Sequence, residues 1–253
     1  MNINAGIAAR YMKVRDMRIK NIFDKDTLNK KLRTGWGVSF LVDNRVLFDT
    51  GENGEWLLEN MRSLGVDINK IEAVVISHDH WDHWGGLWDL LQQRKGMPVY
   101  MCPHFGPEFK DKALALGADL VEIEKLTQII QNVFSTGEIP GAYKGKYMAE
   151  QALVLKTKNG LTIITGCAHP GILKMVEKAR TKFPDESIYL VLGGFHLMES
   201  DKRAIEIVAE NFKKMNIIKT GPTHCSGDVA KEIFKRSYGD NFIPIKAGQD
   251  IEV

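Results

Sequence analysis

The sequence predicts an α/β fold in which two mixed β-sheets form a sandwich with helices on the outside. Short strand pairs come early in each half of the 253-residue chain, and helices then alternate with strands. Hydrophobic residues make up 44% of the chain, enough to fill an extended core. Because no low-complexity linker divides the sequence, we expect a single domain over residues 1–253, with residues 1–10 as a candidate flexible tail.

The first half begins with residues 1–35, which have no clear hydrophobic period. The runs 38–42 and 46–48 are rich in β-formers, and Asp43-Asn44 between them favours a tight hairpin turn. The elements expected next are a helix over 55–64, a strand over 71–77, a helix over 86–93, a strand over 98–102, a helix over 108–116, and strands over 120–123 and 129–134.

The second half repeats this order. Residues 136–146 hold several Gly and Pro residues and are expected to form a loop. Strands over 152–156 and 161–165 flank Asn159-Gly160, a strong signal for a two-residue hairpin. The remaining elements expected are helices over 172–183, 202–215 and 228–238, and strands over 188–192, 217–220, 242–245 and 251–253.

Composition argues against several classes of protein. Lys and Arg number 34 against 32 Asp and Glu, so the net charge of +2 does not suggest a nucleic-acid-binding protein. No apolar run approaches the roughly 18 residues that a membrane-spanning helix needs. Three cysteines are too few for a disulfide framework and suggest a reducing compartment. We therefore expect a soluble cytoplasmic protein that binds neither nucleic acid nor membranes.

The seven histidines are the main clue to function, because each follows a predicted strand. In chain order they are His78, His80, His83, His104, His169, His196 and His224. Side chains just beyond the carboxyl ends of strands can meet at one edge of a sheet, where open α/β folds place their sites. Neutral imidazole is the commonest metal-binding side chain, so this pattern predicts a metal site. Only His104 lacks a close partner in this pattern.

The segment 77–87 concentrates the metal-binding residue types. His78 and His80 are two residues apart in an extended or loop segment, so both can face one metal. Asp82 and His83 can turn towards a second metal, and Gly85-Gly86 lets the chain bend before the next helix. A His-rich surface loop and a purely structural metal site are the alternatives. Structural zinc sites are usually rich in cysteine, which disfavours the second alternative.

With this His-x-His-x-Asp-His motif, the chain resembles the metallo-β-lactamase-fold hydrolase superfamily from about residue 36 to 253. The resemblance implies an αβ/βα sandwich and two metal sites. Its implied ligands are His78, His80 and His169 for the first metal, and Asp82, His83 and His224 for the second. Asp49 matches the family's Asp-Thr-Gly position and would hold a ligating imidazole by its other nitrogen. A simple turn-forming role for Asp49 stays open.

Within the superfamily, the chain resembles in particular the branch of dihydropterin ribofuranosylaminobenzene-phosphate synthase-like proteins. The residues that match this branch are 136–140, 150–153, 165–171, 193–197 and 223–225. The chain departs from the superfamily where a bridging Asp is usual, because His196 stands near that point. His196 could bind metal or donate to a substrate oxyanion. The loop between Pro140 and Gln151 is expected to border the pocket.

The implied activity is hydrolysis of a small phosphoester or related anion by a metal-bound hydroxide, with Asp82 and His196 as the catalytic residues. Two zinc ions are the expected cofactors, with manganese or iron as alternatives. A first alternative function is a transferase that condenses a pterin-methyl diphosphate with an aminobenzene ribose phosphate. A second is a di-iron redox or non-catalytic metal-binding protein. Cys167 and Cys225 stand near predicted ligands, either as buried packing residues or as neighbours of the metals.

Overall fold

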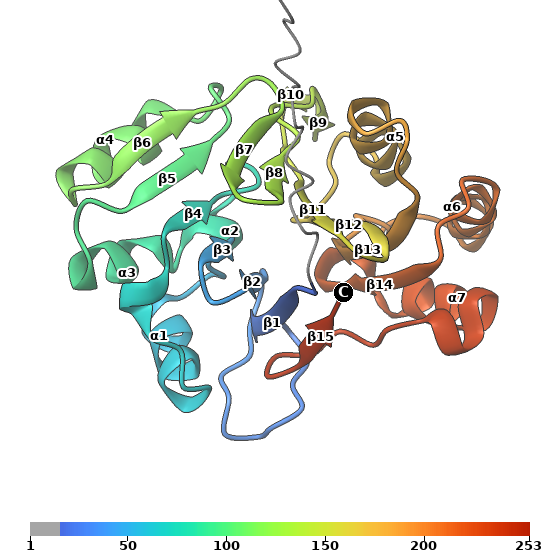
Figure 1. The fold of residues 1–253 in the computed structure, drawn as a ribbon, viewed down its shortest axis with the longest axis horizontal. Helices are drawn as coiled ribbons and strands as arrows, with labels where there is room; N and C mark the ends of the chain where they lie inside the picture. Colours follow the sequence, from blue (N-terminus) through green and yellow to red (C-terminus); the bar gives the residue numbers. More distant parts are fainter. Residues whose placement is uncertain (1–15) are drawn as a thin grey trace, which may run out of the picture.

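Two mixed β-sheets lie face to face with helices on both outer sides (Figure 1). The computed structural model describes residues 16–253, so the tail predicted for residues 1–10 lies outside the described residues. The outer helices are α1 (Gly54–Ser63), α3 (Leu87–Gln93) and α4 (Pro107–Ala115) on one side, and α5 (Ile172–Lys182), α6 (Lys202–Lys214) and α7 (Asp228–Tyr238) on the other. This arrangement confirms the predicted αβ/βα sandwich.

The strand order explains how distant segments reach one edge. The first sheet has the order β15 (Asp250–Glu252), β1 (Arg18–Phe23), β2 (Ser39–Val42), β3 (Val46–Phe48), β4 (Ala73–Val75), β5 (Pro98–Met101), β6 (Asp119–Glu122). The second has the order β14 (Lys219–Thr223), β13 (Ile188–Gly194), β12 (Gly160–Thr165), β11 (Leu153–Thr157), β8 (Val133–Ser135), β7 (Thr127–Ile130). Strands β3 to β6 pair in parallel, as do β12 to β14, so within each set the carboxyl ends share an edge.

Short elements complete the described chain. They are α2 (Trp81–Trp84), the 3₁₀ turns η1 (Ile68–Lys70), η2 (His224–Ser226) and η3 (Gly239–Asn241), and a separate hairpin of β9 (Ala142–Tyr143) and β10 (Lys146–Tyr147). Helix α2 follows β4, and the turn η2 directly follows β14, so both lie where the chain leaves the edge of a sheet.

Three apolar layers hold the sandwich together. Phe40, Phe48 and Leu192 belong to the layer between the two sheets, where all three are fully buried. The helices α1, α3 and α4 pack on the first sheet through a second layer, and α5 to α7 pack on the other sheet through a third. Phe212 and Phe234 lie in the third layer with ring centroids 5.3 Å apart. Buried side chains of this size each stabilise the fold by about 1.5–3 kcal/mol.

Local signals explain the elements that were predicted well. Asp43 and Asn44 have φ angles of 51° and 58°, the left-handed pair that a tight hairpin turn between β2 and β3 requires. The side chain of Asn53 accepts a hydrogen bond from the backbone N–H of Trp56 and so caps α1. Helix α6 is capped in the same way, because Asp201 accepts from the N–H of Ala204.

Four expectations need correction. Strand β1 was not predicted, because the buried Asn21 interrupts its apolar pattern. The run 129–134 is not one strand but the turn of the β7–β8 hairpin, with Asn132 at a φ of 63°. The predicted loop 136–146 contains β9 and the start of β10. The predicted strand 242–245 is reduced to an isolated bridge between Phe242 and Thr220, and the chain that follows is irregular, since Pro244 cannot donate to a strand ladder.

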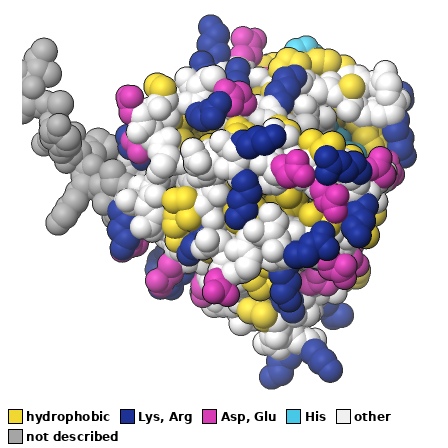
Figure 2. Space-filling model, turned by 90° about the vertical axis from the view of Figure 1, so that its right-hand side faces the viewer, with side chains coloured by type: hydrophobic (Ala, Val, Ile, Leu, Met, Phe, Trp, Pro, Cys, Tyr) yellow, Lys and Arg dark blue, Asp and Glu magenta, His cyan; other side chains and the backbone are white. Residues whose placement is uncertain are grey.

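The surface over α5 to α7 carries Lys and Arg side chains interspersed with Asp and Glu (Figure 2). Within residues 16–253, the helices are too short or too polar for any of them to span a bilayer.

Candidate metal centre

The predicted ligands come from the carboxyl ends of strands in both sheets. Strand β4 ends at Val75, shortly before His78, and β12 ends at Thr165, shortly before His169. Strand β13 ends two residues before His196, and β14 ends at Thr223 directly before His224. Parallel pairing aligns these ends within each sheet, and the facing sheets bring the two edges together. The structure thus gathers side chains that lie up to 146 positions apart (His224 minus His78) in the sequence.

His78, His80 and His169, here called the first ligand group, direct ring nitrogens at one another. Nε2 of His78 lies 3.0 Å from Nδ1 of His80, and Nε2 of His169 lies 3.2 Å from the same Nδ1. Nitrogens bound to one tetrahedral zinc at 2.0–2.1 Å stand roughly 3.3 Å apart. The spacing of these nitrogens therefore fits a common divalent cation.

Asp82, His83 and His224, here called the second ligand group, meet around one carboxylate oxygen. Oδ2 of Asp82 lies 3.4 Å from Nε2 of His83 and 3.3 Å from Nε2 of His224. All three residues are buried. Within residues 16–253, Nε2 of His224 has no hydrogen-bond partner, although it is shielded from solvent. A buried, unpaired nitrogen beside a carboxylate is a position that a cation would satisfy.

His224 also has a contact that opposes this role. The backbone N–H of Gly37 donates to Nδ1 of His224 at 3.2 Å. This contact uses the Nδ1 lone pair and leaves the proton of the neutral ring on Nε2. Ligation through Nε2 requires that proton to move to Nδ1 and the Gly37 contact to open.

Asp49 orients imidazoles of both groups, as expected for its position. Its Oδ2 lies 2.7 Å from Nδ1 of His83 and accepts from the Ser77 hydroxyl at 2.8 Å, while Oδ1 accepts from the Ser77 N–H at 2.7 Å. The same hydroxyl lies 2.9 Å from Nδ1 of His78. Holding Nδ1 in this way turns Nε2 of each ring towards the ligand groups. The predicted contact of Asp49 with a motif histidine is confirmed.

Glu150 is a supporting residue that the sequence analysis missed. It is fully buried, and its carboxylate accepts the backbone N–H groups of Cys167, Ala168 and His169, each at 2.8 Å. Burial raises the pKa of Glu150 to about 7, against the lowering effect of those three N–H groups. Glu150 thereby fixes the loop that carries His169. Residues 150–153 carried the finer family resemblance, but nothing in their pattern showed this role.

The two groups differ in charge. Burial, followed by the neighbouring His83, lowers the pKa of His78 well below its usual value, and burial also lowers the pKa of His80. Burial and then His196 lower the pKa of His169 to about 2. These rings are therefore neutral, the form that binds metal. Burial also acts against a charged His83, but Asp82 and then Asp49 outweigh it and raise the pKa of His83.

Several residues at this edge have left-handed backbone conformations that residues other than glycine rarely adopt. The φ angles are 57° at Asp49, 65° at Ala168, 50° at His196 and 49° at His224. Such conformations persist only where the surroundings enforce them, and they cluster at functional sites.

A cavity of about 520 Å³ opens onto both groups. His80, Asp82 and His224 line it, whereas His78 and His83 are fully buried and do not belong to its lining. The β9–β10 hairpin borders the cavity through Tyr143 and Lys144, which confirms the pocket position expected for the loop after Pro140.

The other two histidines have separate surroundings. His196 lies on the cavity wall with its ring centroid 4.4 Å from that of His169. His104 lies outside the cavity lining, where its Nδ1 pairs with Glu138 at 2.6 Å. Of the aromatic residues near the motif, Trp84 and Trp88 pack with Phe109 in the core, whereas the exposed Trp81 lines the cavity.

Comparison with known proteins gives a consistent assignment. The profile of the metallo-beta-lactamase superfamily matches residues 37–172. The chain is 29% identical to the 7,8-dihydropterin-6-methyl-4-(beta-D-ribofuranosyl)-aminobenzene-5'-phosphate synthase of Methanocaldococcus jannaschii, over 85% of this chain and 89% of the relative. It is 28% identical to an uncharacterised protein of the same organism, over 93% of this chain and all of the relative.

A solved structure agrees with the sequence matches. Tm1679, described as a metal-dependent hydrolase of the beta-lactamase superfamily, superposes with a TM-score of 0.80 at 32% identity, over 94% of this chain and 99% of that one. The family match and the synthase relative both indicate that the chain is an enzyme. They also support the predicted synthase-like branch.

Proposed function

The chain belongs to the metallo-β-lactamase superfamily, and from this premise we propose that it is a metal-dependent hydrolase of a small phosphoester or related anion. The observation that carries the proposal is the pair of ligand groups at the cavity, with the ligand-atom distances of 3.0 to 3.4 Å given above. We propose two zinc ions, because zinc favours imidazole-rich sites, with manganese or iron as alternatives.

The chain's own residues would have distinct roles in such a reaction. His78, His80 and His169 would hold one ion, and Asp82, His83 and His224 the other. When bound, divalent ions would polarise the attacked phosphoryl or carbonyl group and activate a water molecule. Asp82 faces the cavity and has a second carboxylate oxygen with which to orient that water. Cys225 raises the pKa of His196, which favours the protonated ring as a donor to a substrate oxygen.

The cavity wall supports an anionic substrate that contains a flat ring. Lys144 is exposed and lines the cavity, and its ammonium nitrogen lies 5.0 Å from the centre of the Tyr143 ring. Trp36 lines the cavity with its ring centroid 4.7 Å from that of His224. Aromatic faces and a cation at one opening suit a ligand that joins a ring to a phosphate.

The test is a chelator-sensitive screen of phosphomonoesters, phosphodiesters and lactones, with metal analysis of the purified protein. We expect activity to disappear on chelation and to return with one divalent metal. His104→Ala is the matched control, because this histidine pairs with Glu138 outside the cavity lining and should keep its activity. Full activity in the chelated protein, or in a His78→Ala Asp82→Ala double variant, would contradict the proposal.

A second candidate function is the transferase activity named for the Methanocaldococcus jannaschii relative, which aligns over most of both chains. The cavity would then hold a pterin-methyl diphosphate and an aminobenzene ribose phosphate, with Lys144 and His196 facing the phosphates. The test supplies this substrate pair and follows the condensed product together with released diphosphate. Turnover of simple phosphoesters without any condensed product would leave hydrolysis as the function.

A further inference from the structure

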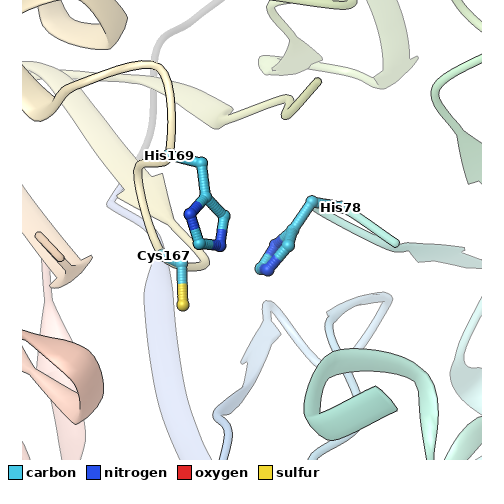
Figure 3. A group of neighbouring side chains, drawn as sticks. All are labelled: His78, Cys167 and His169. Carbon is cyan, nitrogen blue, oxygen red and sulfur yellow. The ribbon is translucent and has the colours of Figure 1, made fainter. Parts of the chain in front are cut away.

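Cys167 lies between the two ligand groups. Its Sγ is within 4.8 Å of the ligand atoms of His78 and His169, and also within 4.8 Å of those of His83 and His224. Its distance to Nε2 of His83 is 3.3 Å. Figure 3 shows Cys167 and His169 on one loop and His78 on the opposite segment, with the three side chains converging on the same space. One sulfur atom therefore borders both groups.

The position from which the superfamily's bridging Asp was expected offers no carboxylate. Strand β13 ends in Gly193-Gly194, and His196 supplies only ring nitrogens. A Cβ on Gly194 would lie 2.1 Å from the carbonyl oxygen of Gly166 and 2.7 Å from Sγ of Cys225, so a larger residue does not fit. Asp49 is already engaged by His83 and Ser77. Between the groups, the structure presents the sulfur of Cys167.

We propose that Cys167 is a metal ligand shared by both groups, and that its thiolate takes the place of the expected bridging carboxylate. This inference rests on the proposed metal binding. A thiolate carries the same single negative charge as a carboxylate, and thiolate sulfur is a regular zinc ligand at about 2.3 Å. Nε2 of His224 is buried, has no hydrogen-bond partner within residues 16–253 and lies within 4.8 Å of the Cys167 sulfur. A cation at this point would satisfy it once its proton has moved and the Gly37 contact has opened.

The chemistry of this step balances without any oxidant. The S–H bond of Cys167 breaks, its proton passes to solvent, and the sulfur lone pair forms the bond to the cation.

The other cysteines have different surroundings. Sγ of Cys225 faces the carbonyl oxygen of Cys167 at 3.6 Å and packs in front of Gly194. It shares a possible metal group with Cys167 and His196, but not with His78 or His83. Sγ of Cys102 faces the carbonyl oxygen of Ser77 at 3.9 Å and joins none of the three possible metal groups within residues 16–253. Cys102→Ser is therefore the matched control.

The experiment reconstitutes the full-length protein with cobalt(II) and records the near-ultraviolet thiolate-to-cobalt absorption together with metal stoichiometry. We expect the absorption in the wild type and in Cys102→Ser, and its loss in Cys167→Ser. The Cys167 variant should also bind its second ion at least about ten-fold more weakly. Circular dichroism checks that each variant folds. Retained absorption in Cys167→Ser, or its loss in Cys225→Ser instead, would overturn the assignment.

X-ray absorption of the wild-type zinc or cobalt protein tests the same point without a variant. A sulfur atom in the metal's coordination shell is the expected result, and its absence overturns the shared-ligand assignment. A protein that binds metal and hydrolyses a phosphoester without a sulfur ligand would refute only this inference. A wild-type protein that binds no divalent metal would refute the proposed function as well.

Discussion

The first and second ligand groups share a cavity but differ in how they balance charge. The first consists of three imidazoles whose pKa values are lowered, mainly by burial, so it is neutral when no ion is bound. In the second, burial raises the pKa of Asp82, but His83 and then His224 lower it by more, and the carboxylate stays charged. The first group has no charge that a cation must balance, so ion binding there depends only on the geometry of its ring nitrogens. The second group holds a buried negative charge, which either a proton on His83 or a metal ion must balance.

Removing an imidazole from the first group should have the largest effect. His80→Ala deletes the ring whose Nδ1 lies within 3.2 Å of both other nitrogens, so only two of the group's three imidazoles remain. We expect loss of one ion per chain and a fall in hydrolysis of more than about 100-fold, because even supporting residues affect metal sites by 10–100-fold. Metal analysis and activity measurements check this. Loss of both ions together would show that the groups form one cooperative site.

Asp49→Asn should weaken the second group by about 10–100-fold in metal affinity, because the amide loses the negative charge that faces Nδ1 of His83. The first group should change less, since Asp49 reaches it only through the Ser77 hydroxyl. Competition with a metal-sensing dye resolves the two affinities. Equal weakening of both ions would mean that the groups do not differ in their need for this charge.

Buried carboxylates beneath the two groups predict a pH-dependent stability. Asp24 accepts from the hydroxyl of Thr223, next to His224, and burial raises its pKa to about 6 despite the lowering effects of Thr223 and His224. Because the pKa of Asp24 in the folded protein exceeds the usual aspartate value of 3.8, its contribution to folding stability is complete below pH 3.8 and is lost as the pH rises through about 6. The loss amounts to about 3 kcal/mol in the unfolding free energy.

Denaturant titrations of metal-free protein at several pH values would measure how the unfolding free energy falls with rising pH, and Asp24→Asn should make this fall smaller. Glu150, beneath His169, should extend the decline to about pH 7 by the same reasoning, since burial raises its pKa. An unfolding free energy that rises steadily between pH 4 and pH 6 in both proteins would contradict the assignment to Asp24.

The smallest expected effect is that of replacing Lys144, an exposed residue of the cavity lining that belongs to neither ligand group. Lys144→Ala should raise KM for an anionic substrate by no more than about five-fold, because exposed charges interact weakly, and should leave kcat unchanged. Steady-state kinetics at two salt concentrations test this, since screening should reduce the difference. A fall in kcat with unchanged KM would instead place Lys144 in the catalytic step.

The sequence predicted the second sheet's helices well, because the amphipathic pattern of a helix is local, and α7 has the bounds expected for it. The motif residues 78–83 could be singled out for the same reason, since they are near neighbours in the chain, and their binding of metal stays a prediction. The support residues were not predictable. Glu150 acts through three backbone N–H groups of a loop 17 to 19 positions away, and Asp24 acts through Thr223, 199 positions away. Such contacts depend on the register of two sheets, which no local pattern records.

The crowding at Gly194 has an evolutionary consequence. A backbone oxygen, and not only a flexible side chain, occupies the space where a Cβ would stand. An acidic residue at position 194 lies one base change away in the genetic code, yet its Cβ would meet the carbonyl oxygen of Gly166 at 2.1 Å. A lineage could therefore keep such a residue only if the backbone at Gly166 moved with it, so the obstacle at this position is structural and not genetic.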